Sequence, residues 1–248
     1  VLCNTDDFSI DFDALDKAVN KNTTAIIVNS PNNPTGAVIS KSDIEKLSAL
    51  LKQKSAEYGR EIYIIADEPY RELTYTAEVP YIPKFYDNTV VCYSYSKSLS
   101  LPGERIGYVF VSPKCADSKE LFAAVCGAAR SMGYVCAPSL MQNVIEKCEG
   151  ETADISQYDK NRTLLYNSLT DIGYKAVKPE GAFYLFVKAL QDDANEFCER
   201  AKKHELLLVP SDSFGIKGYV RISYCVAYDT IKNSIPAFKA LYDEYNQG

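Results

Sequence analysis

The sequence predicts an α/β fold with a mainly parallel sheet, followed by a smaller α+β unit. Three short apolar runs, at residues 25–28, 61–66 and 89–93, have the continuous apolar character of strands covered on both faces. A helical pattern separates the first two runs, and strands that alternate with helices favour parallel pairing. The link from the third run to another at residues 108–111 is very short, which predicts that this strand joins the sheet antiparallel.

The helices expected from apolar periodicity follow in chain order. The clearest one begins at Ser40, where Ser40 and Asp43 form a start like a capping box, and it ends at Gly59. Further helical patterns lie at residues 12–19, 116–131, 138–149, 151–171, 193–204 and 231–245. Helices that flank a parallel sheet support the α/β class for the first part of the chain.

The pattern of expected strands and helices changes near residue 150. Short strands flanked by helices are expected after that point, at residues 174–177, 183–187, 206–209 and 219–225. Such a pattern predicts a smaller α+β unit. We therefore expect two domains, residues 1–149 and residues 150–248.

Composition narrows the possible partners and location of the protein. The formal net charge of the 248 residues is -6 and the isoelectric point is about 5.0, so we expect no nucleic-acid partner. No segment approaches the ~20 apolar residues of a membrane-spanning helix, and no secretory signal peptide is recognised. The eight cysteines are scattered without a C-x-x-C pair, which predicts no metal site and a reducing, cytoplasmic location.

The chain has one histidine, His204, at the expected end of a helix. Hydrolases of the Ser-His or Cys-His type need a histidine beside the nucleophile. We assign His204 no catalytic role and expect a different chemistry.

A lysine flanked by serines follows the apolar run at residues 89–93. In an open α/β sheet the ligand crevice lies beyond the carboxyl ends of the strands, so Lys97 is expected there, where partial desolvation favours the neutral, nucleophilic amine. Arg105 follows eight residues later, and its planar guanidinium suits a phosphate. An amine, the hydroxyls of Ser94 and Ser96, and a guanidinium together suggest an aldehyde cofactor that carries a phosphate. A solvated lysine and a surface arginine are the alternative.

Asp67 ends the apolar run at residues 61–66. A carboxylate at that position is expected in the same crevice. An anion there would favour a cationic group beside it, because an opposite charge stabilises the cation. An aspartate that caps a helix or a turn is the simpler alternative.

The chain resembles the fold type I pyridoxal-phosphate enzymes, specifically the class I and II aminotransferases. The matching motifs, in the family's order, are Asn33-Pro34-Thr35-Gly36, Asp67-Glu68-Pro69-Tyr70, Ser94-Tyr95-Ser96-Lys97 with Arg105 after it, and Arg221 in a strand-like run. The resemblance covers essentially the whole chain. It implies an aminotransferase that moves an amino group between an amino acid and a 2-oxo acid.

The resemblance assigns the cofactor pyridoxal 5'-phosphate to these residues. Lys97 would hold it as a Schiff base and would also move the substrate proton. Ser94, Ser96 and Arg105 would bind the phosphate, and Asp67 would pair with the ring nitrogen.

Three further residues receive roles from the resemblance alone. Tyr70 and Asn33 would hydrogen-bond the phenolic oxygen of the cofactor. Asn33 and Arg221 would bind the substrate carboxylate, which arginine holds bidentately and lysine holds poorly. The respective alternatives are a packed aromatic residue, a solvent-facing turn and a strand arginine that faces water. Residues 179–184 also resemble a family segment near the substrate, which is a weaker signal.

Full-length members of this family have a long segment before the point that matches the start of this chain. In those members the segment completes the large domain, the phosphate site and a dimer interface. We therefore expect this chain to be the C-terminal portion of such an enzyme, with a large domain that is incomplete at its N-terminus. Little activity is expected from the portion alone, and a homodimer from the full-length protein.

Two other functions stay open. A fold type I lyase or synthase would use the same cofactor residues, with the reaction decided by the rest of the pocket. An aminotransferase-like effector domain of a transcription regulator would follow a DNA-binding module. The sequence leaves the amino-acid substrate undetermined.

Overall fold

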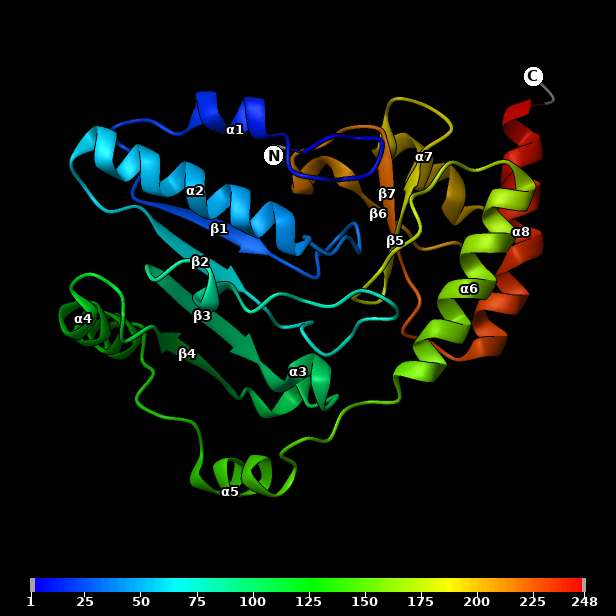
Figure 1. Ribbon diagram of the computed structural model, residues 1–248. Coiled ribbons are helices and arrows are strands. Elements are labelled where there is room, and N and C mark those ends of the chain that lie inside the picture. Colours follow the sequence, from blue (N-terminus) through cyan, green and yellow to red (C-terminus); the bar gives the residue numbers. More distant parts are fainter. Residues whose placement is uncertain (1–2, 247–248) are drawn as a thin grey trace.

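The computed structural model describes residues 3–246, which form two β-sheets (Figure 1). The larger sheet has the strand order β1-β2-β3-β4, with bounds Ala25–Asn29, Tyr63–Asp67, Thr89–Ser94 and Gly107–Val111. The smaller sheet has the order β5-β7-β6, with bounds Tyr184–Lys188, Tyr219–Ser223 and Val209–Pro210. The predicted fold class, an α/β part followed by a smaller α+β part, is confirmed.

The helices lie between these strands much as the periodicity predicts. Helix α2 begins after Ser40, whose hydroxyl accepts a hydrogen bond from the Asp43 N–H, and it ends at Gly59, which has a left-handed φ of 64°. The helix bounds are Phe12–Ala18 for α1, Lys41–Tyr58 for α2, Tyr95–Ser98 for α3, Ser118–Ser131 for α4, Ser139–Lys147 for α5, Ile155–Ile172 for α6, Ala194–Lys202 for α7 and Tyr228–Asn246 for α8.

The larger sheet is mixed. Strands β1, β2 and β3 are parallel, whereas β4 pairs antiparallel with β3, so that Ser94 lies opposite Gly107. The antiparallel strand predicted from the short link after β3 is therefore confirmed. The parallel strands end at one edge of the sheet, which is the edge where a ligand crevice forms in this class of fold.

Two of the predicted strands differ from the structure. At residues 174–177 only Ala176 pairs, in an isolated bridge with Val187. The chain turns away soon afterwards, because the N–H groups of Glu180 and Gly181 both donate to the Gly36 carbonyl. Of the strand expected at residues 206–209, only Val209 belongs to β6. The Leu206 N–H donates to the Ala201 carbonyl at the end of α7 and is therefore not available to the sheet.

Each sheet has its own hydrophobic cluster. One joins β1, β2 and β3 to α1 and α2, with Ile44, Leu47 and Leu51 of α2 almost fully buried. The other joins β5 and β7 to α6, α7 and α8, and it includes Tyr70 and Leu73 from the first part of the chain. The domain boundary near residue 150 stays a prediction, since residues from both sides of it share the second cluster.

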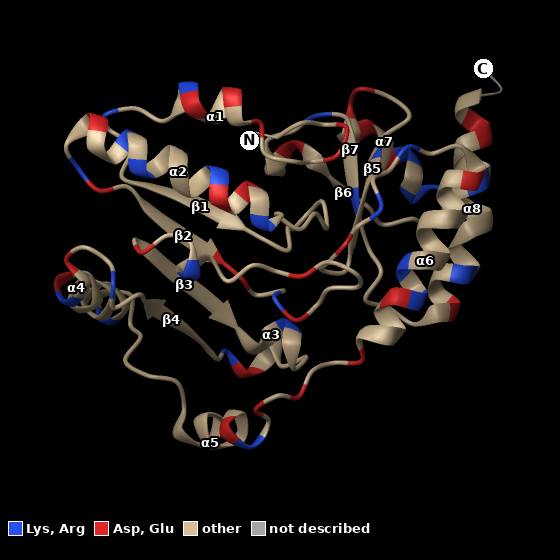
Figure 2. Cartoon of the chain, in the orientation of Figure 1, with Lys and Arg blue, Asp and Glu red and all other residues tan. Residues whose placement is uncertain are grey.

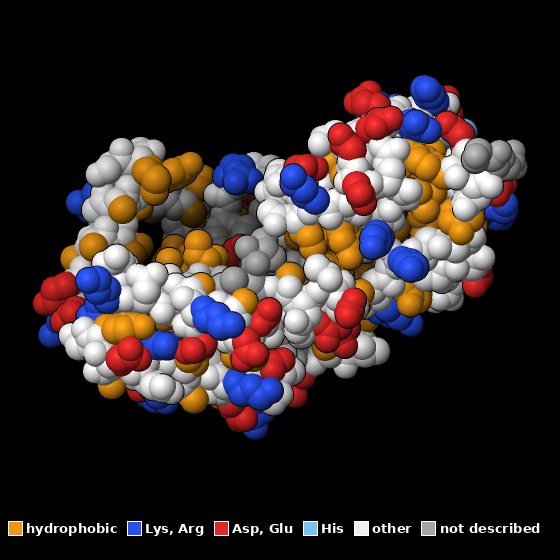
Figure 3. Space-filling model, turned by 90° about the horizontal axis from the view of Figure 1, so that it is seen from above, with side chains coloured by type: hydrophobic (Ala, Val, Ile, Leu, Met, Phe, Trp, Pro, Cys, Tyr) orange, Lys and Arg blue, Asp and Glu red, His pale blue; other side chains and the backbone are white. Residues whose placement is uncertain are grey.

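Helices α4 and α5 differ from the other long helices because none of their residues is buried. Both lie at the periphery of the molecule, joined to it by extended segments (Figure 1). Large apolar side chains are exposed in this part of the chain, namely Phe122, Met132, Tyr134, Val135 and Leu140. The space-filling view shows hydrophobic side chains gathered in patches, and a hollow in the same face (Figure 3). Among residues 3–246, no helix has both the length and the apolar character to cross a membrane.

Charge is almost absent from the strands of the larger sheet (Figure 2). The single charged residue within β1 to β4 is Asp67, the last residue of β2. A carboxylate in this position lies at the ligand-binding edge of the sheet, between the ends of two neighbouring strands.

Candidate active site

The ends of β1 and β2 bring Asn29 and Asp67 side by side. The two residues are paired in the parallel register, and Asp67 is paired in turn with Cys92 on β3. The Asn29 Nδ2 donates to Oδ2 of Asp67 and to its backbone carbonyl, both at 3.0 Å. The sheet register therefore fixes the Asp67 carboxylate at the edge where the sequence predicts it.

The same asparagine also fixes the loop that carries Asn33. The Asn33 N–H donates to Oδ1 of Asn29 at 2.8 Å, which satisfies both ends of the Asn29 amide. Asn32 adds hydrogen bonds from its side chain to Asn29 and accepts one from Thr35 Oγ1, so the loop is held by its own polar groups. The turn predicted from proline and asparagine is therefore an ordered part of the site.

Arg221 reaches this loop from the smaller sheet. Its Nη1 donates to Oδ1 of Asn33 at 2.9 Å, across 188 residues of sequence. Its Cζ lies 4.4 Å from the centroid of the Tyr184 ring and 5.1 Å from that of Phe214, within the range of cation–π contacts. The Nε of Arg221 is buried and has no hydrogen-bond partner among the described residues. Arg221 thus faces the site rather than bulk water.

Lys97 lies on the short helix α3, directly after β3. Its Nζ is 5.4 Å from the ring centroid of Phe183 and 6.0 Å from that of Tyr70. Tyr70 is only 5% exposed, and its hydroxyl lies 3.3 Å from the hydroxyl of Tyr184. Lys97 is therefore partly enclosed by aromatic rings that also contact the arginine side of the site.

Burial changes the acidity of two groups here. The pKa of Asp67 is raised, because the carboxyl is partly desolvated, and the hydrogen bond from Asn29 opposes this only in part. The pKa of Tyr70 is also raised, first by burial and then by its hydrogen bond with Tyr184. Tyr70 therefore stays a protonated donor, and the Asp67 carboxylate would gain from a cationic partner.

The residues predicted for a phosphate are only partly brought together. Ser94 caps α3, where its Oγ accepts from the Ser96 N–H at 3.2 Å and donates to the Ser96 Oγ at 2.8 Å. Arg105 is exposed, has a left-handed φ of 53°, and donates through Nη1 to the Pro102 carbonyl at 2.7 Å. The two serines thus form one cluster, and the guanidinium lies outside it in this structure.

Sequence reasoning missed Asn29, and it gave Tyr184 no role of its own although residues 179–184 were expected near the substrate. Asn29 is the polar residue at the end of an apolar run, and this position could have marked it as a site residue. Its contact with Asp67, however, depends on the strand register, which the sequence does not show. Tyr184 begins β5, and only the three-dimensional structure shows its contacts with both Tyr70 and Arg221.

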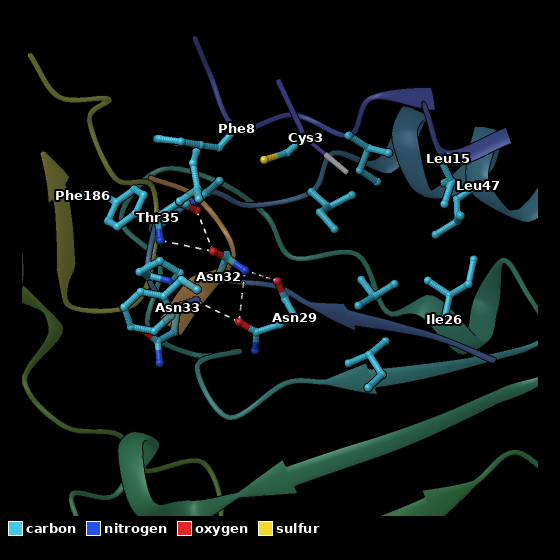
Figure 4. Close-up of a pocket in the computed structure, with 18 residues that line it drawn as sticks. Cys3, Phe8, Leu15, Ile26, Asn29, Asn32, Asn33, Thr35, Leu47 and Phe186 are labelled. Atoms are coloured by element: carbon cyan, nitrogen blue, oxygen red, sulfur yellow. Dashed lines mark hydrogen bonds between the residues drawn. The ribbon is translucent and has the colours of Figure 1, made fainter. Parts of the chain in front are cut away.

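A cavity of about 450 Å³ lies on another side of the Asn33 loop (Figure 4). Its lining is mostly apolar and includes Phe8, Leu47 and Phe186, with Asn29 and Asn33 at one wall. Lys97, Asp67 and Arg221 are not part of the lining. The cavity therefore shares Asn29 and Asn33 with the site but does not include Lys97.

Comparison with known proteins now assigns the class. The model of the family "Aminotransferase class I and II" matches residues 1–238. The chain therefore belongs to the class I and II aminotransferase family, and the resemblance inferred from its motifs is confirmed.

Curated relatives and solved structures agree with that assignment. Aromatic-amino-acid aminotransferase 2 of Thermococcus litoralis is 29% identical over 251 residues, covering 96% of this chain and 62% of that protein. Aspartate aminotransferase of Thermotoga maritima is 34% identical over 219 residues, covering 86% of this chain and 54% of that protein. The chain therefore spans about three-fifths or less of the length of these curated relatives.

Among solved structures, an aminotransferase from Eubacterium rectale has a TM-score of 0.96 and 60% identity, covering 99% of this chain and 62% of that one. The crystal structure of the aspartate aminotransferase from Thermotoga maritima has a TM-score of 0.83 and 28% identity, covering 95% of this chain and 61% of that one. These matches place both sheets of the present structure within a fold known from crystals.

Proposed function

We propose that this chain supplies the cofactor and substrate residues of an aminotransferase that moves an amino group between an amino acid and a 2-oxo acid. The observation that carries the proposal is one unbroken series of side-chain contacts. It runs through residues from five separated parts of the sequence, in the order Asp67, Asn29, Asn33, Arg221, Tyr184, Tyr70 and Lys97, and the link from Asn29 to Asn33 is made by the Asn33 backbone N–H. The known family adds the activity to this geometry.

The residues fit pyridoxal 5'-phosphate, the cofactor that the resemblance implies. Asp67 is a partly buried carboxylate, and no cationic side chain among residues 3–246 pairs with it, which suits a protonated ring nitrogen. Tyr70 and Asn33 offer hydrogen-bond donors for the phenolic oxygen, and Lys97 offers an amine for the aldehyde. When bound, the cofactor supplies an electron sink for charge that develops at the substrate Cα.

The polypeptide's own part in the reaction is to bind the substrate and to move a proton. Arg221 would bind the substrate carboxylate through its planar fork, and its unpartnered buried Nε is one free donor for that purpose. Asn33 holds the guanidinium in place through its Oδ1. The Nζ of Lys97 would take a proton from the substrate and return it, in an environment of aromatic rings that limits its solvation.

We propose Ser94, Ser96 and Arg105 as the phosphate-binding set. The serine hydroxyls are already adjacent. The Arg105 side chain is exposed, and the hydrogen bond described for it goes to the nearby Pro102 carbonyl, so a rotamer change would free its guanidinium for an anion. The antiparallel pairing of Ser94 with Gly107 keeps the backbone of Arg105 close to the serines.

Two wider proposals follow from the family resemblance. The full-length protein would be a homodimer with a large domain that includes residues 1–149 and a small domain from residue 150. A cytoplasmic location is supported by its eight unpaired cysteines.

The test is a substrate screen of the full polypeptide encoded by the gene that contains this chain. With pyridoxal 5'-phosphate present, we expect an amino group to pass from an amino acid to a 2-oxo acid. Lys97→Ala should reduce the rate by about three orders of magnitude or more, because it removes both the cofactor link and the proton carrier.

Absorption spectroscopy supplies the control. The wild type should show an absorption band that depends on Lys97, and Lys97→Arg, which keeps the positive charge, should lose it as Lys97→Ala does. A Lys97→Ala protein that keeps the wild-type band and rate would show the assignment of Lys97 to be wrong. Products in which a different bond is broken would instead indicate a lyase or synthase.

A further inference from the structure

Tyr184 lies between the two functional sides of the proposed site. It is 8% exposed, its hydroxyl is 3.3 Å from that of Tyr70, and its ring centroid is 4.4 Å from the Cζ of Arg221. The antiparallel register explains this position, because Tyr184 is paired with Ser223 and is therefore a diagonal neighbour of Arg221 on one face of the sheet.

The Arg221 guanidinium needs a neighbour that holds it in place without neutralising its charge. Among residues 3–246 no carboxylate lies within ion-pair distance of its guanidinium, whose described partners are the Asn33 amide oxygen and two aromatic rings. A carboxylate partner would hold the guanidinium but would also neutralise it. An aromatic face attracts the cation and leaves its N–H groups free for an incoming anion.

Tyr70 needs a hydroxyl neighbour for a different reason. It is buried, and the Tyr184 hydroxyl is the described partner of its own hydroxyl. When the Tyr70 hydroxyl donates a hydrogen bond to a ligand, its oxygen can still accept a hydrogen bond, and the Tyr184 hydroxyl is placed to donate it. A hydroxyl that accepts a hydrogen bond is a stronger donor in turn.

We propose that Tyr184 is a positioning residue, which holds the Arg221 guanidinium with its ring and orients the Tyr70 hydroxyl with its own. The inference rests on the proposed function, since it supplies the reason for placing both groups. It means that the cofactor side and the substrate-carboxylate side of the site are set by one side chain. The competing explanation is that Tyr184 only fills the core beside Phe183, whose ring centroid is 4.8 Å away.

Two substitutions separate these functions of Tyr184. Tyr184→Phe removes the hydroxyl and keeps the ring, whereas Tyr184→Met removes both and roughly keeps the volume. Tyr224→Phe is the matched control, because Tyr224 is a fully buried tyrosine whose hydroxyl bonds to Tyr75 and to the Ala182 carbonyl, outside the site.

Two measurements on the full polypeptide, without added cofactor, test the inference. The first is the 13Cζ resonance of Tyr70, which reports on the hydrogen bonding of its hydroxyl. The second is the rate at which phenylglyoxal modifies Arg221, followed by mass spectrometry of the peptide. Tyr184→Phe should shift the Tyr70 resonance and leave the modification rate of Arg221 within about two-fold of the wild type. Tyr184→Met should shift the Tyr70 resonance too, and it should raise the modification rate of Arg221 about three- to ten-fold, because a cation–π contact is lost. Tyr224→Phe should do neither.

The outcomes separate this inference from the proposed function. An unchanged Tyr70 resonance in Tyr184→Phe, or an unchanged Arg221 rate in Tyr184→Met, would overturn the inference even if the protein transaminates. Both effects in a protein that does not transaminate would support the positioning and contradict the function. Tyr184→Leu takes the place of Tyr184→Met if that variant does not fold.

Discussion

Helices α6 and α8 differ sharply from α4 and α5, although all four carry apolar residues at helical spacing. In α6 and α8, which lie side by side (Figure 1), Leu165, Leu169, Phe238 and Leu241 are buried. In α4 and α5 no residue is buried, and Leu140 is 72% exposed. The difference teaches that apolar spacing produces a helix with an apolar face, whereas a partner decides whether that face is buried.

Side-chain capping at the N-terminus also distinguishes α6 from α4 and α5. Asp154 at the start of α6 accepts hydrogen bonds from the N–H groups of Ser156 and Gln157. Asp117 before α4 and Pro138 before α5 make no side-chain cap. The Asp154 side chain thus satisfies two of the free N–H groups in the first turn of α6, a stabilisation that the side chains of Asp117 and Pro138 do not give α4 and α5.

The largest effect is expected from a leucine in the packed region. Leu169→Ala removes a side chain with 0% exposure from the cluster around β5 and β7. The lost burial and the cavity should lower the free energy of unfolding by about 3–5 kcal/mol. Urea unfolding monitored by circular dichroism measures the loss. A loss below about 1 kcal/mol would mean that this cluster is not closed in solution.

The buried acid Glu68 extends the comparison between buried and exposed residues. Burial of an apolar side chain stabilises the fold, whereas burial of a charged carboxylate destabilises it. Glu68 is 2% exposed, its Oε1 has no described hydrogen-bond partner, and Arg71 pairs with its other oxygen at 3.0 Å. Burial raises the pKa of Glu68 from 4.5 to about 7, and the charge of Arg71 opposes the shift. The folded state therefore retains the proton longer than the unfolded state, so Glu68 makes the fold less stable as the pH rises from about 4.5 to about 7.

Glu68→Gln should remove this pH dependence. Relative to the wild type, the variant should gain on the order of 3 kcal/mol at most at pH 8 and little at pH 4, where the wild-type carboxyl is protonated in both states. Urea titrations at several pH values measure the difference. Glu146→Gln on exposed α5 is the control, and its stability should follow the wild type at every pH. A variant that loses stability equally at pH 4 and pH 8 would contradict the pKa argument.

The sequence was sufficient where local pattern decides the structure. Lys97 and Asp67 could be placed at strand ends, because each charge follows an apolar run that must be buried. The hydrogen bond from Arg221 to Asn33 was foreseeable only through the family resemblance, since it spans 188 residues. Tyr184 received no role, because its two contacts depend on strand register and on the packing of Tyr70, from the segment after β2, against the smaller sheet.

The sequence pattern predicted a strand wrongly where a backbone N–H group already donates to another part of the chain. The strand expected at residues 206–209 is short because the Leu206 N–H bonds to the end of α7. Arg105 has a left-handed backbone conformation that the motif does not reveal, and its guanidinium bonds to the Pro102 carbonyl. The motif thus placed the residue near Ser94 in the chain, but the structure decides where the guanidinium points.

The smallest effect is expected from the same substitution in the unpacked region. Leu140→Ala makes on α5 the change that Leu169→Ala makes on α6, but the side chain is already 72% exposed. Little burial is lost and alanine favours the helix slightly, so the free energy of unfolding should change by less than about 0.5 kcal/mol. Parallel urea titrations of Leu140→Ala and Leu169→Ala compare the two changes in the free energy of unfolding directly. A loss of 2 kcal/mol or more for Leu140→Ala would show that α5 is covered in solution, and the contrast between the two helix pairs would no longer hold.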